Sequence, residues 1–245
     1  MPLPLPPIRS IRDFYAFEQH VKTCRAQRGL GMVNQWYEIP VFYFSNPASV
    51  IGHGDPVYAP KSSEELDFEL EIAAFIGTEA SDLPEDDSAM NCVAGFTIYN
   101  DWSARDLQRK EMAVGLGPSK GKDFANALGP HLVPFSELRD RYQNGRLELN
   151  MSASINGKTV SRGNASSMYW TWPQLLAHAS RDTRLLPGDV IGSGTVGTGC
   201  ILELTPEVTG GWLKAGDIVR LEIERLGVLE NRVASRPSSP QQNER

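Results

Sequence analysis

The spacing of the apolar residues limits this chain to a fold with many short strands and few helices. Residues 11–28 have the spacing of one buried helical face, and Gly29 is a suitable stop after that helix. A second helix is predicted for residues 170–183, beginning near Pro173, and a short third helix for residues 135–142. Elsewhere glycine and proline interrupt the apolar runs, so we expect an α+β domain that is mainly β.

The predicted strands are distributed over the whole chain. Residues 39–60 are predicted to form two strands separated by a turn. The other predicted strands lie within residues 66–77, 92–100, 146–164, 189–208 and 217–233. Within residues 146–164, the pair Asn156-Gly157 indicates a two-residue hairpin turn. A chain of 245 residues, 40% of them hydrophobic, can form one large domain, which we assign to residues 1–233. The polar residues 234–245 contain proline and serine and predict a disordered tail.

Charge and composition exclude several classes of function. The net charge of -6 leaves no basic surface for nucleic acid, and no apolar run reaches the ~20 residues that a membrane helix needs. The N-terminal residues lack the pattern of a secretory signal. The three cysteines, Cys24, Cys92 and Cys200, form no CxxC pair, which is typical of a reducing compartment. We therefore expect a cytoplasmic protein with no nucleic-acid or membrane partner.

Two carboxylates point the same way in the strand predicted for residues 66–77. Glu69 and Glu71 are two residues apart, about 6.6 Å along the strand, and therefore share a face. The residues that follow are apolar on both faces, and the strand contains no Lys or Arg to compensate buried carboxylates. A bound hard cation is one explanation, with Mg²⁺ or Ca²⁺ favoured over zinc, and a solvated strand face is the other. Asp101 directly follows the apolar run of residues 92–100, and it is either a third ligand or the cap of a helical turn.

Five motifs occur in the same order as in a known family of enzymes. They are LDFELEIAAFIG (66–77), YNDWSARDLQ (99–108), GLGPSKGKDF (115–124), MYWTWPQLLAH (168–178) and LLPGDVIGSGTVGTG (185–199). With these motifs the chain closely resembles the catalytic domain of the fumarylacetoacetate hydrolase family, over residues 13–233. The resemblance implies a mixed β-roll fold, a bound divalent metal and a homodimer.

The resemblance also implies roles for individual residues near the N-terminus. In the motif DFYAFEQH, Asp13 matches a metal ligand, Tyr15 a substrate contact and His20 the general base. On the helix predicted for residues 11–28, Asp13 and His20 are two turns apart on one face, about 10.5 Å along the axis. One of them can then bind the metal while the other reaches a substrate held on it. Glu203 matches the acid that orients the histidine.

The other positions implied by the resemblance surround the substrate. The residues implied to stabilise an oxyanion are Arg105, Gln108 and Lys122, and the substrate contacts are Tyr15, Tyr43 and Thr195. The implied metal ligands are Asp13, Glu69, Glu71 and Asp101. Glu203 alternates with Leu202 and Leu204, so we expect it on a strand, facing a site. Either Arg25 or Arg28 stands near the position of the family's substrate-binding arginine.

These roles imply a metal-dependent hydrolase that cleaves a carbon–carbon bond in a fumarylacetoacetate- or acylpyruvate-like oxo acid. Mg²⁺ is the expected cofactor, with Ca²⁺ or Mn²⁺ as alternatives. Two other functions stay open, namely a 2-hydroxydienedioate isomerase or decarboxylase of aromatic catabolism and a non-catalytic metal- or ligand-binding homologue. His20 and Glu203 favour an enzyme, because binding needs no acid–base pair. Cys24, one helical turn after His20, suits a Cys-His nucleophile, but that reading leaves the carboxylates without a role.

Overall fold

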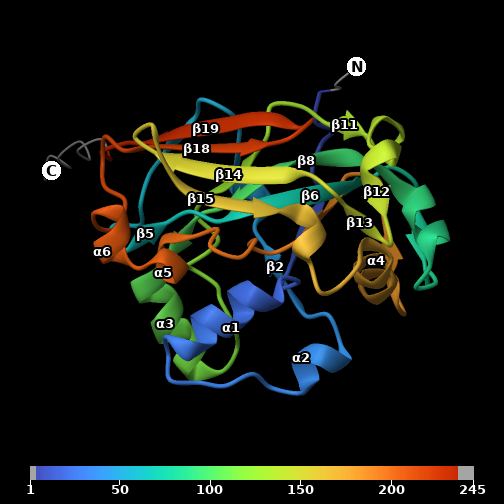
Figure 1. Cartoon of the computed structure of the whole chain (residues 1–245), viewed down its shortest axis with the longest axis horizontal. Helices are drawn as coiled ribbons and strands as arrows, with labels where there is room; N and C mark the ends of the chain where they lie inside the picture. The colour runs from blue at the N-terminus through green and yellow to red at the C-terminus, as the bar shows by residue number, and fades with distance from the viewer. Residues whose placement is uncertain (1–3, 237–245) are drawn as a thin grey trace, which may run out of the picture.

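The computed structural model describes residues 4–236 and has an eight-stranded sheet at its centre (Figure 1). Its strands are β1 (Ser10–Phe14), β2 (Phe42–Ser45), β3 (Val50–Ile51), β6 (Leu70–Ile76), β8 (Val93–Asp101), β10 (Asn126–Leu128), β11 (Val133–Pro134) and β17 (Asp189–Gly192). Seven of them lie in the order β2-β1-β17-β6-β8-β10-β3, and β11 pairs with β8. Every residue of β6 is buried, including Glu71, which accounts for the apolar run of residues 72–76.

A second, five-stranded sheet covers one face of the first. Its strands are β4 (Pro56–Val57), β14 (Asn150–Ile155), β15 (Lys158–Asn164), β18 (Ile218–Ile223) and β19 (Gly227–Val233), in the order β15-β14-β18-β19-β4. Along β18, buried and exposed residues alternate, so one face of this sheet meets solvent and the other meets the core. Figure 1 shows this sheet as the upper layer, with β18 and β19 against β8.

Three short two-stranded ladders complete the β-structure. They are β5 (Leu66–Asp67) with β9 (Ser103–Ala104), β7 (Ala80–Ser81) with β16 (Arg184–Leu185), and β12 (Tyr142–Gln143) with β13 (Arg146–Leu147). The predicted hairpin of residues 146–164 is confirmed for β14 and β15, which are antiparallel around Asn156-Gly157. The pair β18 and β19 confirms the strands predicted for residues 217–233.

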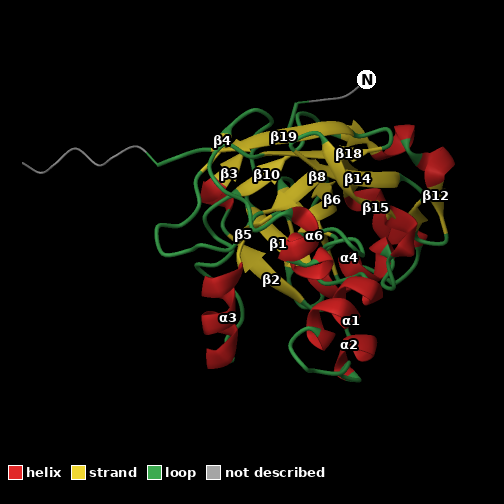
Figure 2. Ribbon diagram, turned by 60° about the vertical axis from the view of Figure 1, so that its left-hand side comes forward, coloured by secondary structure: helices red, strands yellow, loops and turns green. Residues whose placement is uncertain are grey.

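The described helices are short, and three of them lie on one side of the central sheet. They are α1 (Glu18–Ala26), α2 (Gln35–Glu38), α3 (Arg105–Val114), α4 (Trp172–Ser180), α5 (Ile201–Leu204) and α6 (Pro206–Thr209). The 3₁₀ turns are η1 (Pro47–Ser49), η2 (Asp87–Cys92), η3 (Phe135–Glu137), η4 (Arg139–Arg141) and η5 (Ala165–Ser167). Helices α1, α2 and α3 lie on the side of the central sheet away from the five-stranded sheet (Figures 1 and 2). Helix α4 begins where the sequence predicts, because Thr171 and Gln174 form a capping box and Pro173 follows the cap.

The prediction of a mainly β, mixed fold is confirmed, but three local predictions are wrong. Residues 11–28 are not one helix, because residues 10–14 form β1 and the helix spans only residues 18–26. Backbone pairing of β1 with β17 on one side and β2 on the other outweighs the helical spacing. Asp13 therefore lies on a strand, and the two-turn relation to His20 does not exist.

The other two errors concern helical turns. Residues 135–142 form two 3₁₀ turns followed by the start of β12 instead of one helix. The strand predicted for residues 189–208 ends at Gly192, and Glu203 lies in the helical turn α5. A strand there would need a partner, whereas the N–H groups that begin this turn are bonded by a buried carboxylate, Asp67.

The ends of the described chain bear on two further expectations. Most of the tail predicted for residues 234–245 lies outside the described residues, which end at Arg236. Ala234 and Arg236 donate hydrogen bonds to the carbonyls of Val57 and Ala59. Among residues 4–236, no helix has both the length and the apolar character needed to span a bilayer.

Candidate active site

Four carboxylates from the region of strands β1, β6 and β8 of the central sheet meet in one buried cluster. Asp13 lies in β1, Glu71 in β6 and Asp101 at the end of β8, while Glu69 directly precedes β6. One oxygen from each lies within 4.8 Å of those of the other three, and all four side chains are buried. The alternation that places Glu69 and Glu71 on one side thus brings both to the same cluster, although the strand begins only at Leu70.

Two basic side chains are buried against this carboxylate cluster. Lys122 Nζ lies 2.5 Å from Glu69 Oε2 and 2.5 Å from Asp101 Oδ2. Arg105 donates from Nη2 to Glu69 Oε1 at 2.8 Å and from Nε to Asp67 Oδ2 at 2.9 Å. Together with Asp67, five carboxylates face two cations, so full ionisation would leave three uncompensated negative charges in a buried site. Such an excess is costly unless another cation is bound.

The pKa values of the carboxylates follow from this imbalance. Burial raises the pKa of Asp13, and the charge of Asp101 raises it further. Burial and the charge of Asp13 likewise hold the pKa of Glu71 well above its usual range. The pKa of Asp101 is raised by burial to about 6, against the opposing effect of Lys122. Glu69 differs, because Lys122 and the neighbouring guanidinium outweigh burial and lower its pKa.

The donor set fits a hard divalent cation. All four groups offer oxygen, which Mg²⁺, Ca²⁺ and Mn²⁺ prefer. Tyr43 donates its hydroxyl to Asp101 Oδ2 at 2.5 Å, but among residues 4–236 no group donates a hydrogen bond to the buried Asp101 Oδ1. A buried carboxylate oxygen without a donor is rare in proteins, and a metal ion would satisfy it.

The loop after β17 holds two of the carboxylates in place. The backbone N–H of Gly194 donates to Asp13 Oδ1 at 3.3 Å and to Glu71 Oε2 at 3.1 Å. Thr195 Oγ1 donates to Glu71 Oε1 at 3.2 Å, so in this structure the threonine contacts a carboxylate of the cluster. Gly194 has a φ of +79°, and a Cβ there would lie 2.4 Å from the Phe14 carbonyl oxygen. Gly194 of the motif GSGTVGTG is therefore needed for this contact.

A His-Glu pair lies near the carboxylate cluster, close enough for the charge of His20 to lower the pKa of Glu69 together with Lys122 and Arg105. His20, on α1, has its Nδ1 atom 2.5 Å from Oε1 of Glu203, on α5, and both side chains are buried. The other Glu203 oxygen accepts a hydrogen bond of 3.0 Å from the backbone N–H of Thr198. The ring of Tyr15 stands edge-on to the imidazole, with 5.3 Å between the ring centroids. The structure therefore brings together the two residues that were paired from the resemblance, 183 positions apart in the chain.

The surroundings of the pair favour a charged imidazole in the protein without metal. Burial lowers the pKa of His20, but its contacts with Cys200 and Glu203 raise it, to about 10 in balance. A folded-state pKa above the unfolded value of 6.5 means that the pair stabilises the fold fully below pH 6.5. That contribution is then lost as the pH rises toward 10.

This linkage predicts a pH dependence of stability. The free energy of unfolding of the metal-free protein should fall relative to that of a His20→Ala/Glu203→Ala double variant as the pH rises from 6.5 to 10. The shift corresponds to a loss of at most about 5 kcal/mol. Urea unfolding of both proteins at several pH values measures the difference. A difference that stays constant over this range would show that the imidazole carries no stabilising proton.

The other residues assigned from the resemblance differ in their surroundings. Gln108 Oε1 accepts a hydrogen bond of 3.0 Å from Arg105 Nη1, so it lies against the cluster through the arginine. Arg25 turns to the carbonyl of Gly31, whereas Arg28 donates to the Cys24 carbonyl and contributes to the electrostatic environment of Tyr15. Of the two arginines, Arg28 is therefore the better candidate for a contact beside the site. Asp67, which pairs with Arg105, was not among the site residues predicted from the sequence. Its position two residues before Glu69 is the signal that could have indicated it.

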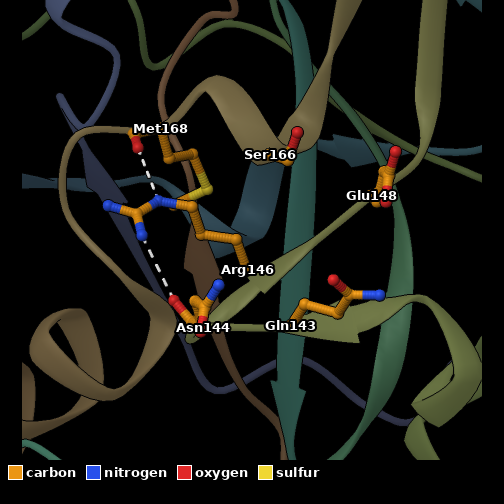
Figure 3. A pocket seen from close by; sticks show the side chains of 6 residues that line it. All are labelled: Gln143, Asn144, Arg146, Glu148, Ser166 and Met168. Carbon is orange, nitrogen blue, oxygen red and sulfur yellow. Dashed lines mark hydrogen bonds between the residues drawn. The ribbon is translucent and has the colours of Figure 1, made fainter.

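Two surface depressions lie away from these residues. One, of about 360 Å³, lies beside β12 and β13 and is lined by Gln143, Asn144, Arg146, Glu148, Ser166 and Met168 (Figure 3). Arg146 donates to the carbonyls of Met168 and Asn144 there, so its charge is already engaged by the protein (Figure 3). The other, of about 380 Å³, lies near Pro56 and Phe124. Neither depression contains a carboxylate of the cluster or the His-Glu pair.

Comparison with known proteins agrees with this geometry. Residues 9–234 match the family model described as fumarylacetoacetate (FAA) hydrolase, C-terminal. An oxaloacetate tautomerase of Xenopus laevis, described as mitochondrial, is 36% identical over 195 residues, which are 79% of this chain and 58% of that protein. The chain thus spans less than two thirds of this curated relative.

Two solved structures have the same fold. Fumarylpyruvate hydrolase from Pseudomonas aeruginosa, in complex with Mn²⁺ and pyruvate, superposes with a TM-score of 0.78 at 22% identity over 96% of both chains. A 5-carboxymethyl-2-hydroxymuconate delta-isomerase from Mycobacterium smegmatis has a TM-score of 0.72 at 26% identity, covering 95% of this chain and 81% of that one. Similar chains are thus described as a hydrolase, an isomerase and a tautomerase.

Proposed function

Because this chain belongs to the fumarylacetoacetate hydrolase family, whose members are enzymes, we propose that it is a divalent-metal-dependent hydrolase of diketo or oxo acids. The reaction is the cleavage of a carbon–carbon bond next to a carbonyl, in a fumarylacetoacetate- or acylpyruvate-like substrate. The observation that carries the proposal is the His-Glu pair next to a buried four-carboxylate cluster. An acid–base pair beside a cation site suits a reaction that moves a proton near a polarised carbonyl.

The cation would be held by Asp13, Glu69, Glu71 and Asp101. Mg²⁺ is the proposed ion, with Mn²⁺ or Ca²⁺ as alternatives, and the Mn²⁺ complex of the Pseudomonas aeruginosa hydrolase supports a cation of this class. When bound, such an ion polarises the oxygens of an oxo acid and orients it. Tyr15, Tyr43 and Thr195 are the proposed substrate contacts. Tyr43 and Thr195 already hydrogen bond to carboxylates of the cluster, which places both hydroxyls at its border.

The proposed proton transfer uses His20 and Glu203. The carboxylate accepts from Nδ1, which leaves Nε2 to take a proton from water, and the charged carboxylate stabilises the imidazolium that forms. The resulting hydroxide attacks the carbonyl carbon, the carbon–carbon bond breaks, and the imidazolium gives its proton to the leaving carbon. His20 must be neutral before this step, although its pKa in the metal-free protein is about 10. Positive charge held in the nearby carboxylate cluster opposes the imidazolium and favours that neutral form.

The negative charge that develops on the attacked carbonyl needs buried donors. Lys122 and Arg105 are buried and charged, and Gln108 adjoins the arginine. Donors held ready in such a site contribute about 3 kcal/mol each to stabilising an oxyanion in other enzymes. Lys122 is already fixed between Glu69 and Asp101, so it requires little reorganisation.

A second candidate is tautomerisation or isomerisation of the same class of acid. The 36% identity to the oxaloacetate tautomerase of Xenopus laevis favours it, as does the isomerase with the same fold. In that reaction His20 takes the proton from a carbon next to the carbonyl instead of from water. Removal of that proton leaves an enolate, and decarboxylation of such an acid would leave an enolate as well. A non-catalytic binding protein, by contrast, would need no acid–base pair.

Product analysis separates these functions. Metal-stripped protein reloaded with Mg²⁺ or Mn²⁺ is incubated with acylpyruvates, hydroxydienedioates and enol-oxaloacetate, and the products are identified by NMR. Two carboxylic-acid fragments indicate hydrolysis, an unchanged carbon count indicates isomerisation, and released CO₂ indicates decarboxylation. Binding of these acids without any product would contradict the enzyme proposal and support a ligand-binding role.

We also propose that the protein is a cytoplasmic homodimer without nucleic-acid or membrane partners. The net charge of -6 supports the absence of nucleic acid, and the cysteines, all three free, support a reducing compartment. On the edge strand β2, Phe44 is 64% exposed, an apolar side chain that a second subunit would cover. Light scattering tests the dimer, since a 27.0 kDa particle at micromolar concentration would contradict it.

A further inference from the structure

A second group of metal-binding side chains surrounds the imidazole of His20. One ligand atom each of His20, Cys24 and Cys200 lies within 4.8 Å of the others, and all three side chains are buried. Cys24 follows His20 by four residues on α1, which places both on one face of the helix. Cys200 directly precedes α5, the turn that carries Glu203. The fold therefore encloses one imidazole between two thiols from distant parts of the chain.

The spacing within this His-Cys-Cys cluster is close to that of a tetrahedral site. Cys24 Sγ lies 3.7 Å from His20 Nδ1 and 3.9 Å from Nε2. Ligand atoms around zinc, at bond lengths of about 2.0–2.3 Å, are separated by about 3.5–3.8 Å. Small side-chain movements would thus bring all three ligand atoms onto one ion. The cysteines carry no disulfide, so both sulfurs are available as ligands.

The chemistry of the cluster favours a softer ion than the carboxylate cluster does. Two thiolates and one imidazole suit Zn²⁺, whereas Mg²⁺ and Ca²⁺ prefer oxygen. A Zn²⁺ ion with two thiolates has no net charge, which suits a buried position. His20 Nδ1 faces the Glu203 carboxylate, so Nε2, which lies 3.9 Å from Cys24 Sγ, is the ring nitrogen left for a metal.

We propose that His20, Cys24 and Cys200 form a second metal site, selective for Zn²⁺ and separate from the carboxylate cluster. Binding there occupies Nε2, the atom that takes the proton in the proposed reaction. Zn²⁺ at this site therefore inhibits the enzyme even when the carboxylate cluster holds Mg²⁺. The binding follows from the cluster geometry alone, and only the inhibition rests on the proposed function.

The binding is tested with Co²⁺ as a spectroscopic substitute for Zn²⁺. Reduced protein in excess Mg²⁺ is titrated with Co²⁺, and thiolate ligation gives a near-ultraviolet charge-transfer band that oxygen ligands do not give. We expect one equivalent of Co²⁺ to produce the band and one equivalent of Zn²⁺ to remove it. Cys24→Ser and Cys200→Ser should each weaken the band strongly, while Cys92→Ser, which alters a buried cysteine outside the cluster, should retain it.

The inhibition is tested on whichever oxo acid the protein converts. With Mg²⁺ in excess, Zn²⁺ should inhibit the wild type and the Cys92→Ser control, and Cys24→Ser should need at least tenfold more Zn²⁺ for half inhibition. Each variant is compared with its own rate without Zn²⁺, and circular dichroism checks that it is folded. The proposal is overturned if the wild type gives no charge-transfer band, or if Cys24→Ser and Cys200→Ser bind Co²⁺ as the wild type does. A normal band without inhibition would keep the site and remove only the role of His20 as base.

Discussion

Removal of both Glu69 and Glu71 is expected to weaken Mn²⁺ or Mg²⁺ binding by more than about 100-fold. The double variant Glu69→Ala/Glu71→Ala loses two of the four proposed ligands. Loss of even an outer-shell partner of a metal commonly lowers the metal affinity by about 10–100-fold. Isothermal titration of metal-stripped protein measures the affinity. The wild type should bind one cation per chain at the carboxylate cluster, and the variant should give no measurable heat.

Thermal unfolding provides a second measure of the same prediction. A cation at 100 times its Kd stabilises the folded wild type by about 2.7 kcal/mol, so its Tm should rise with Mn²⁺ while that of the variant stays constant. Without metal, the two losses act in opposite directions, because Glu71 is a carboxylate with a raised pKa whereas Glu69 pairs with Lys122 and Arg105. The Tm of each protein with Mn²⁺ is therefore compared with its own Tm without metal. Glu79→Ala/Glu85→Ala is the matched control, because it removes two surface glutamates. Wild-type affinity in the Glu69/Glu71 variant would refute the assignment.

His20→Ala should lower kcat by about 10²–10⁴, the range found for loss of a general base. The affinity for Mn²⁺ should remain within a few-fold of the wild type, since His20 is not among the proposed carboxylate ligands. Glu203→Gln should lower kcat less than loss of the imidazole. It keeps an oxygen that accepts from Nδ1 but removes the charge that stabilises the imidazolium. Steady-state kinetics with the identified substrate, alongside metal titration, measures both effects.

The control for this prediction is a histidine outside the site. His53 lies on an exposed loop, where its Nδ1 accepts a hydrogen bond from the backbone of Glu230, and His53→Ala should leave kcat unchanged. The pH profile adds a readout that a structural defect would not produce, because Glu203→Gln should lower the apparent pKa of the base. A wild-type kcat in His20→Ala would show that another residue is the base, and the proposed proton transfer would then be wrong.

Much of the sheet could be predicted from the sequence, because strand periodicity and turn chemistry act between near neighbours. The alternation around Glu69 and Glu71 correctly put both carboxylates on one side, and Asn156-Gly157 correctly located a hairpin. The position of Asp101 at the end of an apolar strand was equally visible. These features need only a few adjacent residues, so local rules are sufficient to find them.

The residues that surround each site residue in the fold could not be predicted from local patterns. The resemblance paired His20 with Glu203, but local rules put Asp13 on a helix and Glu203 on a strand, and both assignments were wrong. The strand of Asp13 forms because β17 and β2, from distant segments, supply its backbone partners. The enclosure of the imidazole by Cys24 and Cys200 likewise depends on the packing of α1 against α5. Asp13 pairs with Tyr43 of β2, 30 positions away, and with Gly192 of β17, 179 positions away. The energies of such contacts arise only once the chain has folded, so no local pattern encodes them.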